Sequence, residues 1–211
     1  MKICTTKTRL TEEDALQLAS RDNSGLIGAF FNKLGHVPKE VSVLQIRKFY
    51  YPYYLEAAEA KLLRAAGLPT RRVVYTVAME GGFGTVQQMK GRPATSYEEV
   101  DPSAVVVCKI DKAGADANVA KFIKRRAYKI FHQYPQVSTL EAYVVYKPHY
   151  ACLCQKGERR FFRILDAEIK DRNFMMDIKF RELTFMDKDA ANDRIDPALF
   201  SPENSPAADE L

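Results

Sequence analysis

The pattern of apolar and polar positions divides the chain into two similar halves. In each half, a segment with apolar residues at helical spacing is followed by segments rich in β-branched and aromatic residues, which are typical of strands. Residues 41–56 and 137–152 share six identities in 16 positions, at a constant spacing of 96 residues. We therefore expect an internal duplication, in which each copy consists of a helix followed by an antiparallel hairpin.

The helix of the first copy is expected to begin after Thr11, a residue suited to an N-cap and followed by three acids. A second stretch at helical spacing covers 26–34, and Pro38 marks its end. In the second copy the helix is expected to run from Asp116 as N-cap to about His132. Its apolar face consists of Val119, Phe122, Ile123, Ala127 and Ile130.

Each helix precedes a predicted hairpin. The returning strands contain the similar segments Arg71–Tyr75 and Arg159–Arg163. Residues 55–67 also have high helix propensity, so a helical turn inserted in the first hairpin is an alternative to continuous strand. A further strand is expected in each copy, at 105–110 and at 177–185.

The predicted fold class is therefore α+β, with two small helix-on-sheet units in tandem. The first unit is expected to span 1–100, the second 101–186, and an acidic tail 187–211. In the first copy, the strand residues Val77–Glu80 are followed by Gly81-Gly82 and then Val86. These residues make the unit similar in outline to small cystatin-like or PepSY-like domains, in which a helix packs on an antiparallel sheet. Folds of this kind host many roles, so the similarity does not determine an activity.

The charge distribution separates the tail from the rest of the chain. The formal net charge is +5, but residues 187–211 hold seven acids against Lys188 and Arg194. A basic body with an acidic tail rich in Pro, Ser and Ala predicts a flexible tail and a surface that attracts anions. No apolar run approaches the ~20 residues that span a bilayer, and no secretory leader is evident, so a cytoplasmic protein is expected.

A cluster of His149, Cys152 and Cys154 suggests either a metal site or a thiol nucleophile. On a strand, however, the two cysteines share one face and His149 points to the other. We therefore expect reduced cysteines in the core, with no metal, cofactor or catalytic residue indicated. The turn Gly81–Gly84 matches no phosphate-loop pattern and is expected to contain glycines with positive φ.

Two groups of side chains are candidates for binding. One is a possible interface or ligand groove on the outer face of the strands, formed by Tyr51, Tyr53, Tyr143 and His149. The other is a basic group that can attract anions, formed by Arg71, Arg72, Lys121, Lys124, Arg125, Lys129, Arg159 and Arg160.

Three functions follow as hypotheses. The leading one is a non-enzymatic binding or scaffold protein that assembles with itself or another protein through sheet and aromatic surfaces, as in a homodimer. The alternative is anion or nucleic-acid binding through the basic helix and the arginine pairs, although no RNP-type motif is present. A third is an enzyme that uses Cys152, Cys154 or paired acids, for which no catalytic pattern is visible.

Overall fold

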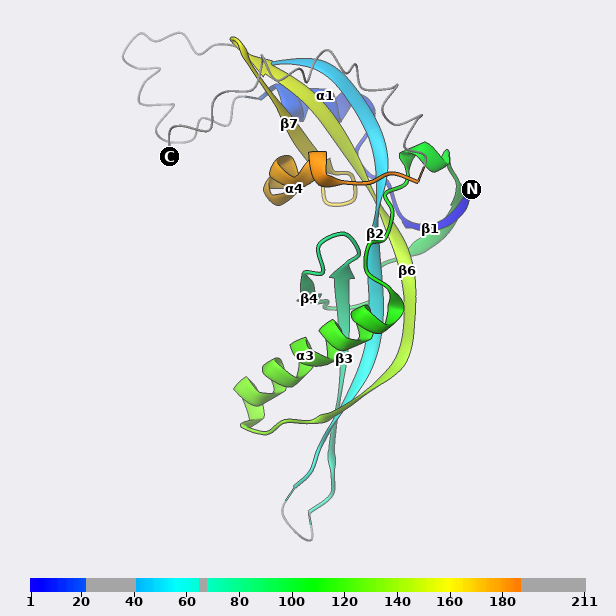
Figure 1. Cartoon of the computed structure of the whole chain (residues 1–211), viewed down its shortest axis with the longest axis vertical. Helices are drawn as coiled ribbons and strands as arrows, with labels where there is room; N and C mark the ends of the chain where they lie inside the picture. The colour runs from blue at the N-terminus through cyan, green and yellow to red at the C-terminus, as the bar shows by residue number, and fades with distance from the viewer. Residues whose placement is uncertain (22–40, 65–67, 187–211) are drawn as a thin grey trace, which may run out of the picture. The chain divides into compact units, whose positions relative to one another are not determined.

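The computed structural model describes residues 1–21, 41–64 and 68–186 (Figure 1). Its mixture of helices and strands confirms the α+β class. No helix in these ranges is long and apolar enough to cross a membrane. The expected helical stretch at 26–34, its stop at Pro38 and the acidic tail lie outside the described residues.

The chain forms two compact units that interleave along the sequence. The first unit contains Met1–Lys7, Tyr50–Val100 and Val106–Lys147, and the second contains Thr8–Phe49, Asp101–Val105 and Pro148–Leu211. Two long strands, β2 (Val41–Leu62) and β6 (Gln136–Lys156), contribute residues to both. The tandem division into 1–100 and 101–186 as products of a duplication stays a prediction.

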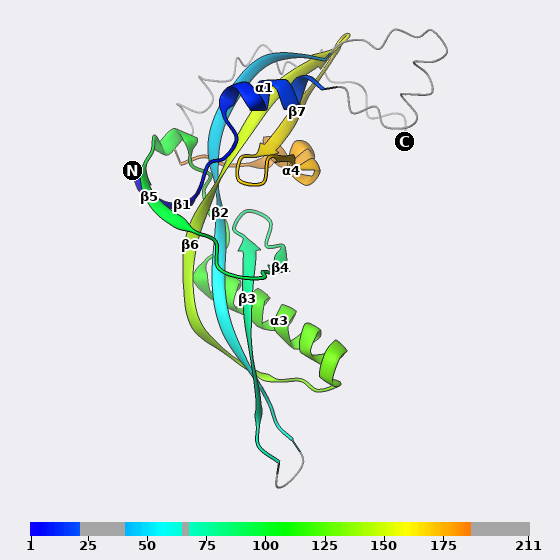
Figure 2. The same cartoon turned by 180° about the vertical axis from the view of Figure 1, so that it is seen from behind.

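The first unit is a sheet covered by one long helix. Its strands follow the order β4-β3-β2-β6-β1-β5 within an eight-stranded sheet in which β7 also pairs with β6 and β8. Figure 2 shows β1 and β5 side by side. Helix α3 packs against β3 and β2 through buried residues that include Ala58, Val77, Met79, Val119 and Ile123. The elements not yet given bounds are β1 (Lys2–Thr6), β3 (Arg71–Glu80), β4 (Val86–Gln88), β5 (Thr95–Glu99) and α3 (Lys112–Phe131).

Helix α3 begins earlier than the sequence predicted. Asp111, not Asp116, is the N-cap, and its Oδ1 accepts a hydrogen bond from the amide of Gly114 at 2.8 Å. The helix ends at His132, which adopts the left-handed conformation with φ 54°. The buried face consists of Ala115, Val119, Ile123 and Ala127. The i, i+4 spacing of these residues confirms the expected amphipathic helix, whereas Ile130 is exposed.

The second unit has a helix on each face of its strands. One face is covered by α1, which buries Ala15 and Ala19 against Cys152, Cys154 and Leu165. The opposite face carries an aromatic cluster in which Phe180 contacts Phe49 and Phe162. The remaining elements of this unit are α1 (Glu12–Ser20), η1 (Pro102–Ala104), β7 (Arg159–Asp166), β8 (Asp171–Arg172), α4 (Phe174–Lys179) and η2 (Phe180–Glu182).

Both ends of α1 are satisfied by side chains. Thr11 caps the N-terminus as predicted, accepting a hydrogen bond from the amide of Asp14 at 3.1 Å. At the C-terminus, the buried guanidinium group of Arg163 donates to the carbonyl oxygens of Ala19 and Arg21. Strand β7 therefore supplies the cap that the end of α1 lacks in its own sequence.

Each helix packs on the hairpin that it does not precede in the sequence. Helix α1 comes before β2, and its cluster includes Val41 at the start of that strand, but most of its other buried strand partners lie on β6 and β7. Helix α3 comes before β6, but it packs on the hairpin formed by β2 and β3. The sequence placed each helix with the hairpin that follows it, so the packing of the helices is exchanged relative to that expectation.

Both hairpins are present, and their registers are equivalent in detail. Strand β2 pairs with β3 from Tyr53–Glu80 to Leu62–Arg71, and β6 pairs with β7 from His149–Asp166 to Lys156–Arg159. In the next position, the amide of Gly81 donates to Pro52 O at 2.9 Å and that of Ala167 to Pro148 O at 3.0 Å. Glu80 and Asp166 thus hold corresponding places, whereas Arg71 and Arg159, which the sequence comparison aligned, do not.

The expected strand is confirmed at residues 55–62, where pairing with β3 overrides the helix propensity of the segment. Two other local expectations need correction. Residues 105–110 form only isolated bridges at Val105 and Val106. Residues 177–185, expected to be a strand, lie largely in α4 and η2, because Asn173 caps a helix there by accepting from the amide of Met176.

Candidate anion-binding sites

The predicted aromatic surface is largely internal. Tyr51 and Tyr53 are buried in the first unit and contact each other edge to face, with ring centroids 5.5 Å apart. Tyr143, in the same unit, is half-buried. His149 is buried in the second unit, stacked on Phe49. The structure therefore does not bring the four residues onto one exposed surface.

The cysteines behave as the sequence predicted. Cys152 and Cys154 are free and buried in the core under α1. Burial raises the pKa of Cys152 to about 12 and that of Cys154 to about 11, so both are protonated thiols at neutral pH. Within the described ranges, no group of three His, Cys, Asp or Glu side chains is arranged to hold a metal ion.

In the turn after β3, glycine is required more by close packing of neighbouring side chains than by backbone conformation. Of its glycines, only Gly84 has a positive φ, 74°. A Cβ on Gly81 would lie 2.5 Å from Sγ of Cys108, and one on Gly82 would meet the hydroxyl of Tyr51. The expectation of a positive-φ turn is thus correct for Gly84 and wrong for the first two glycines.

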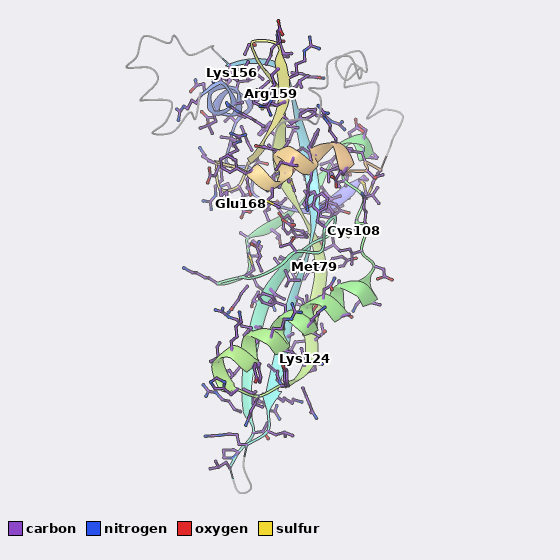
Figure 3. The ribbon with its side chains drawn as sticks, turned by 60° about the vertical axis from the view of Figure 1, so that its left-hand side comes forward. Met79, Cys108, Lys124, Lys156, Arg159 and Glu168 are labelled. Atoms are coloured by element: carbon purple, nitrogen blue, oxygen red, sulfur yellow. The ribbon has the colours of Figure 1, made fainter. Side chains whose placement is uncertain are left out.

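The predicted basic residues fall into two separate groups, one in each unit. In the first unit, the exposed side of α3 carries Lys121, Lys124, Arg125 and Lys129, and the start of β3 carries Arg71 and Arg72. In the second unit, Arg159 and Arg160 lie at the turn end of the β6–β7 hairpin, where Figure 3 marks Lys156 and Arg159.

A groove of about 710 Å³ lies beside β7 in the second unit, and we name it the arginine groove. It runs along consecutive residues of β7 and one side of α4. Its lining contains six cations and a single carboxylate. The lining residues are Lys156, Arg159, Arg160, Phe161, Phe162, Arg163, Arg172, Phe174, Asp177, Ile178 and Arg181.

The one acidic group of the arginine groove is neutralised by its neighbours. Asp177 accepts hydrogen bonds from Nε of Arg172 at 2.6 Å and from the amide of Ile164 at 2.6 Å. Burial raises the pKa of Asp177, and these two hydrogen bonds oppose the rise. Arg163 is also committed, through its bonds to α1. Arg159 and Arg160 have no ion pair or hydrogen-bond partner for their side chains among the described residues.

The aromatic rings of the arginine groove are each associated with an arginine. The guanidinium carbon of Arg172 lies 4.4 Å from the ring centroid of Phe174, and that of Arg163 lies 5.3 Å from Phe161. Phe174 is 61% exposed and Ile178 is 78% exposed. The groove therefore combines positive charge with an accessible apolar wall on α4.

Sequence reasoning found only the β7 side of this groove. It identified Arg159 and Arg160 but missed Arg172, Phe174 and Arg181, and it expected a strand at 177–185 where the structure has α4 and η2. The signal that was available is Asn173, a preferred N-cap residue, followed by Met175 and Met176, which have high helix propensity.

Comparison of the chain with known protein families, with curated proteins and with solved structures finds no match, and the similarity in outline to cystatin-like or PepSY-like domains stays a prediction.

Proposed function

We propose that the protein is a non-enzymatic binding protein that holds nucleic acid, as single strand, in the arginine groove. The observation that supports this most is the lining itself, in which six cations face one carboxylate that is already paired. A local excess of positive over negative charge is the electrostatic requirement for binding a chain of phosphates.

The apolar wall favours a single strand over a compact anion. Unpaired bases stack on exposed aromatic rings, and Phe174 presents such a ring beside Arg172. Phosphates would then lie along Arg159 and Arg160, whose guanidinium groups can donate two parallel hydrogen bonds to an anion. A small inorganic anion would use the arginines but not Phe174 or Ile178.

Assembly through aromatic sheet surfaces, the leading hypothesis from the sequence, receives less support. It relied on exposed Tyr51 and Tyr53, and both rings are buried. We therefore place nucleic-acid binding first.

The test is fluorescence anisotropy of labelled single-stranded RNA, single-stranded DNA and duplex DNA with the full chain, at ~50 and ~200 mM salt. We expect the single strands to bind more tightly than the duplex, and binding to weaken as salt rises. Because the acidic residues 187–211 can compete for the groove, the chain ending at Met186 is measured in parallel. Absence of binding by both proteins at ~50 mM salt would rule the proposal out.

The site is tested by replacing Arg159 and Arg160 with Ala together. Removing one arginine–phosphate interaction should lower the slope of log affinity against log salt by about 1. The matched control replaces Lys7 and Lys90, two cations of the first unit that lie outside the groove, with Ala. The proposal predicts a large decrease in affinity for the arginine pair and little change for the lysine pair; equal decreases would point to non-specific attraction and contradict it.

A further inference from the structure

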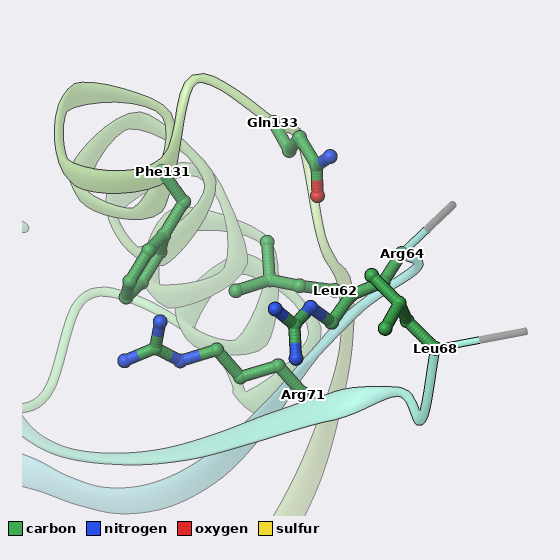
Figure 4. Close-up of a pocket in the computed structure, with 6 residues that line it drawn as sticks. All are labelled: Leu62, Arg64, Leu68, Arg71, Phe131 and Gln133. Carbon is green, nitrogen blue, oxygen red and sulfur yellow. The ribbon is translucent and has the colours of Figure 1, made fainter.

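A pocket of about 220 Å³ lies in the first unit where the β2–β3 hairpin continues past the end of α3 (Figure 4). Its cationic side chains are Arg64 and Arg71, and none of its lining residues is acidic. Figure 4 shows the guanidinium group of Arg71 beneath the ring of Phe131, and that of Arg64 turned toward the same space. The lining is completed by Leu62, Leu68 and Gln133.

Arg71 is held in place by its surroundings. Its guanidinium carbon lies 4.5 Å from the ring centroid of Phe131, a cation–π contact that leaves the N–H groups at the guanidinium edge able to donate. Glu59, the carboxylate of the neighbouring strand, is paired with Lys61 and Arg72 instead.

Like charges gathered without a carboxylate repel one another unless an anion lies between them. Two arginines lining one small pocket supply the N–H donors that a phosphate group accepts in pairs. The volume is below the ~300–1,000 Å³ of pockets that enclose a whole small-molecule ligand. The pocket therefore suits one anionic group, with the rest of the ligand outside it.

An exposed aromatic pair lies at the same end of α3 as the residues Phe131 and Gln133 of this pocket. Tyr128 of α3 and Tyr134, just beyond its end, are stacked with ring centroids 4.6 Å apart and planes 15° apart. Tyr134 is 70% exposed, so its ring offers area to a ligand. Gln133 lines the pocket and Tyr134 is the next residue, so their Cα atoms are only about 3.8 Å apart.

We propose that the end of α3 binds a nucleotide, with the phosphate between Arg64 and Arg71 and the base against the stacked pair of Tyr128 and Tyr134. Phosphate and base of one nucleotide are separated by a single sugar, and consecutive residues, Gln133 and Tyr134, belong to the pocket and to the tyrosine pair. Stacking of a base on an exposed aromatic ring contributes about 1–3 kcal/mol and tolerates any base. The ligand can be a free nucleotide or one residue of a single strand, since both present the same phosphate and base.

The test is isothermal titration of the full chain with AMP, UMP, adenosine, inorganic phosphate and a 5′-phosphorylated trinucleotide. We expect the two monophosphates to bind similarly, and more tightly than adenosine or phosphate alone. Tighter binding of the trinucleotide than of AMP would identify a strand as the natural ligand, and equal binding would identify a free nucleotide; both results support the site. Phosphate binding as tightly as AMP would overturn the role of the tyrosines.

Single-residue variants test the phosphate-binding part and the base-binding part of the site separately. Arg64→Ala should weaken AMP about tenfold, the effect expected for one charged hydrogen bond, and leave adenosine unchanged. Tyr134→Ala should weaken AMP at least about fivefold, whereas Tyr134→Phe should retain the affinity because it keeps the ring. Tyr97→Ala is the matched control, because Tyr97 is a 72% exposed tyrosine elsewhere in the same unit. Unchanged AMP affinity in both Arg64→Ala and Tyr134→Ala would overturn the proposal.

This site does not depend on the arginine groove of the second unit. Replacing Arg159 and Arg160 with Ala should leave AMP affinity unchanged. If long single strands fail to bind while AMP binding still requires Arg64 and Tyr134, the function proposed for the groove is wrong and this site stands. If AMP binding is abolished in the groove variant instead, the nucleotide lies in the groove and this proposal is wrong.

Discussion

Arg172 and Asp177 form a close ion pair in which Nε and Nη2 of the arginine both lie 2.6 Å from the same carboxylate oxygen, Oδ2. The other oxygen of Asp177 accepts the amide of Ile164. One carboxylate thus fixes α4 to β7 and cancels one positive charge of the arginine groove. The charge of Asp177 therefore increases the stability of the fold and decreases the affinity of the groove for anions.

Replacing Asp177 with Asn should separate these two effects. The amide oxygen can still accept from Ile164, but the charge is gone and Arg172 becomes available to an anion. We expect tighter binding of single-stranded nucleic acid and a decrease in stability of about 1–3 kcal/mol, the range for a buried charged hydrogen bond. Anisotropy and urea unfolding measure the two quantities. Unchanged affinity would contradict the account of the groove as a site governed by charge.

Arg163 should be the residue whose replacement most affects α1. It is 5% exposed, and its guanidinium group donates to the carbonyl oxygen of Ala19 in the last turn and to that of the C-cap residue Arg21. Arg163→Met should therefore destabilise the protein by about 2 kcal/mol and speed amide exchange in α1. Arg163→Lys should recover part of this stability, because an ammonium group can donate to one of the carbonyls. A change in stability below about 0.5 kcal/mol for Arg163→Met would show that the cap contributes little.

Glu56 should make stability depend on pH. It is 3% exposed, and its Oε1 accepts a hydrogen bond from the hydroxyl of Thr139 at 2.7 Å. Burial raises the pKa of Glu56, an effect that the bond from Thr139 opposes. The folded protein then keeps a proton that the unfolded chain has released. The resulting stabilisation is complete below the unfolded-state pKa and disappears as pH rises through the folded-state pKa.

The measurement is the free energy of unfolding of wild type and Glu56→Gln from about pH 4 to about pH 7, a range that begins near the ordinary pKa of a glutamate. The difference should grow with pH in favour of the Gln variant, which carries no charge to bury. Glu99→Gln, at an exposed site on β5, serves as the control and should follow the wild type. A constant difference between wild type and Glu56→Gln would show that Glu56 titrates alike in the folded and unfolded states.

The four cysteines should divide into two classes by reactivity. Cys4 and Cys108 are half-buried, whereas Cys152 and Cys154 are buried and have raised pKa values of about 12 and about 11. A thiol reagent at about pH 8 should therefore modify no more than two cysteines in the native protein and all four after unfolding. Rapid native modification of a variant with Cys4→Ser and Cys108→Ser would contradict the buried placement of the other two.

The sequence predicted the elements whose signals are local. Thr11 with its following acids marked the start of α1, the period of Val119, Ile123 and Ala127 identified α3, and alternation placed Cys152 and Cys154 together in a core. Residues 55–62 were ambiguous because their helix propensity conflicts with the strand pairing that the partner strand imposes.

The candidate sites were harder to predict because they are assembled from distant segments. Arg159 and Arg160 were visible as a charged pair, but their groove is completed by α4, whose position depends on the Arg172–Asp177 pair and on the bond from Ile164. The aromatic character of the α3 end was also hidden, since nothing in the spacing of Tyr128 and Tyr134 shows that the chain reverses at His132 and stacks their rings.

Because the packing of α1 and α3 is exchanged, neither half of the chain contains both a helix and the hairpin on which that helix packs. A fragment of residues 1–100 would contain α1 without the β6–β7 hairpin that covers it, and β2–β3 without α3. The complementary fragment 101–211 would contain α3 without the β2–β3 hairpin, and the β6–β7 hairpin without α1. Neither half can complete a hydrophobic core alone, so we expect the two fragments to be unfolded when separate and to reconstitute a native complex when mixed, as two subunits of a heterodimer. The duplication stays a prediction, and together with this packing it implies a half-length ancestor that would form an obligate dimer with swapped helices.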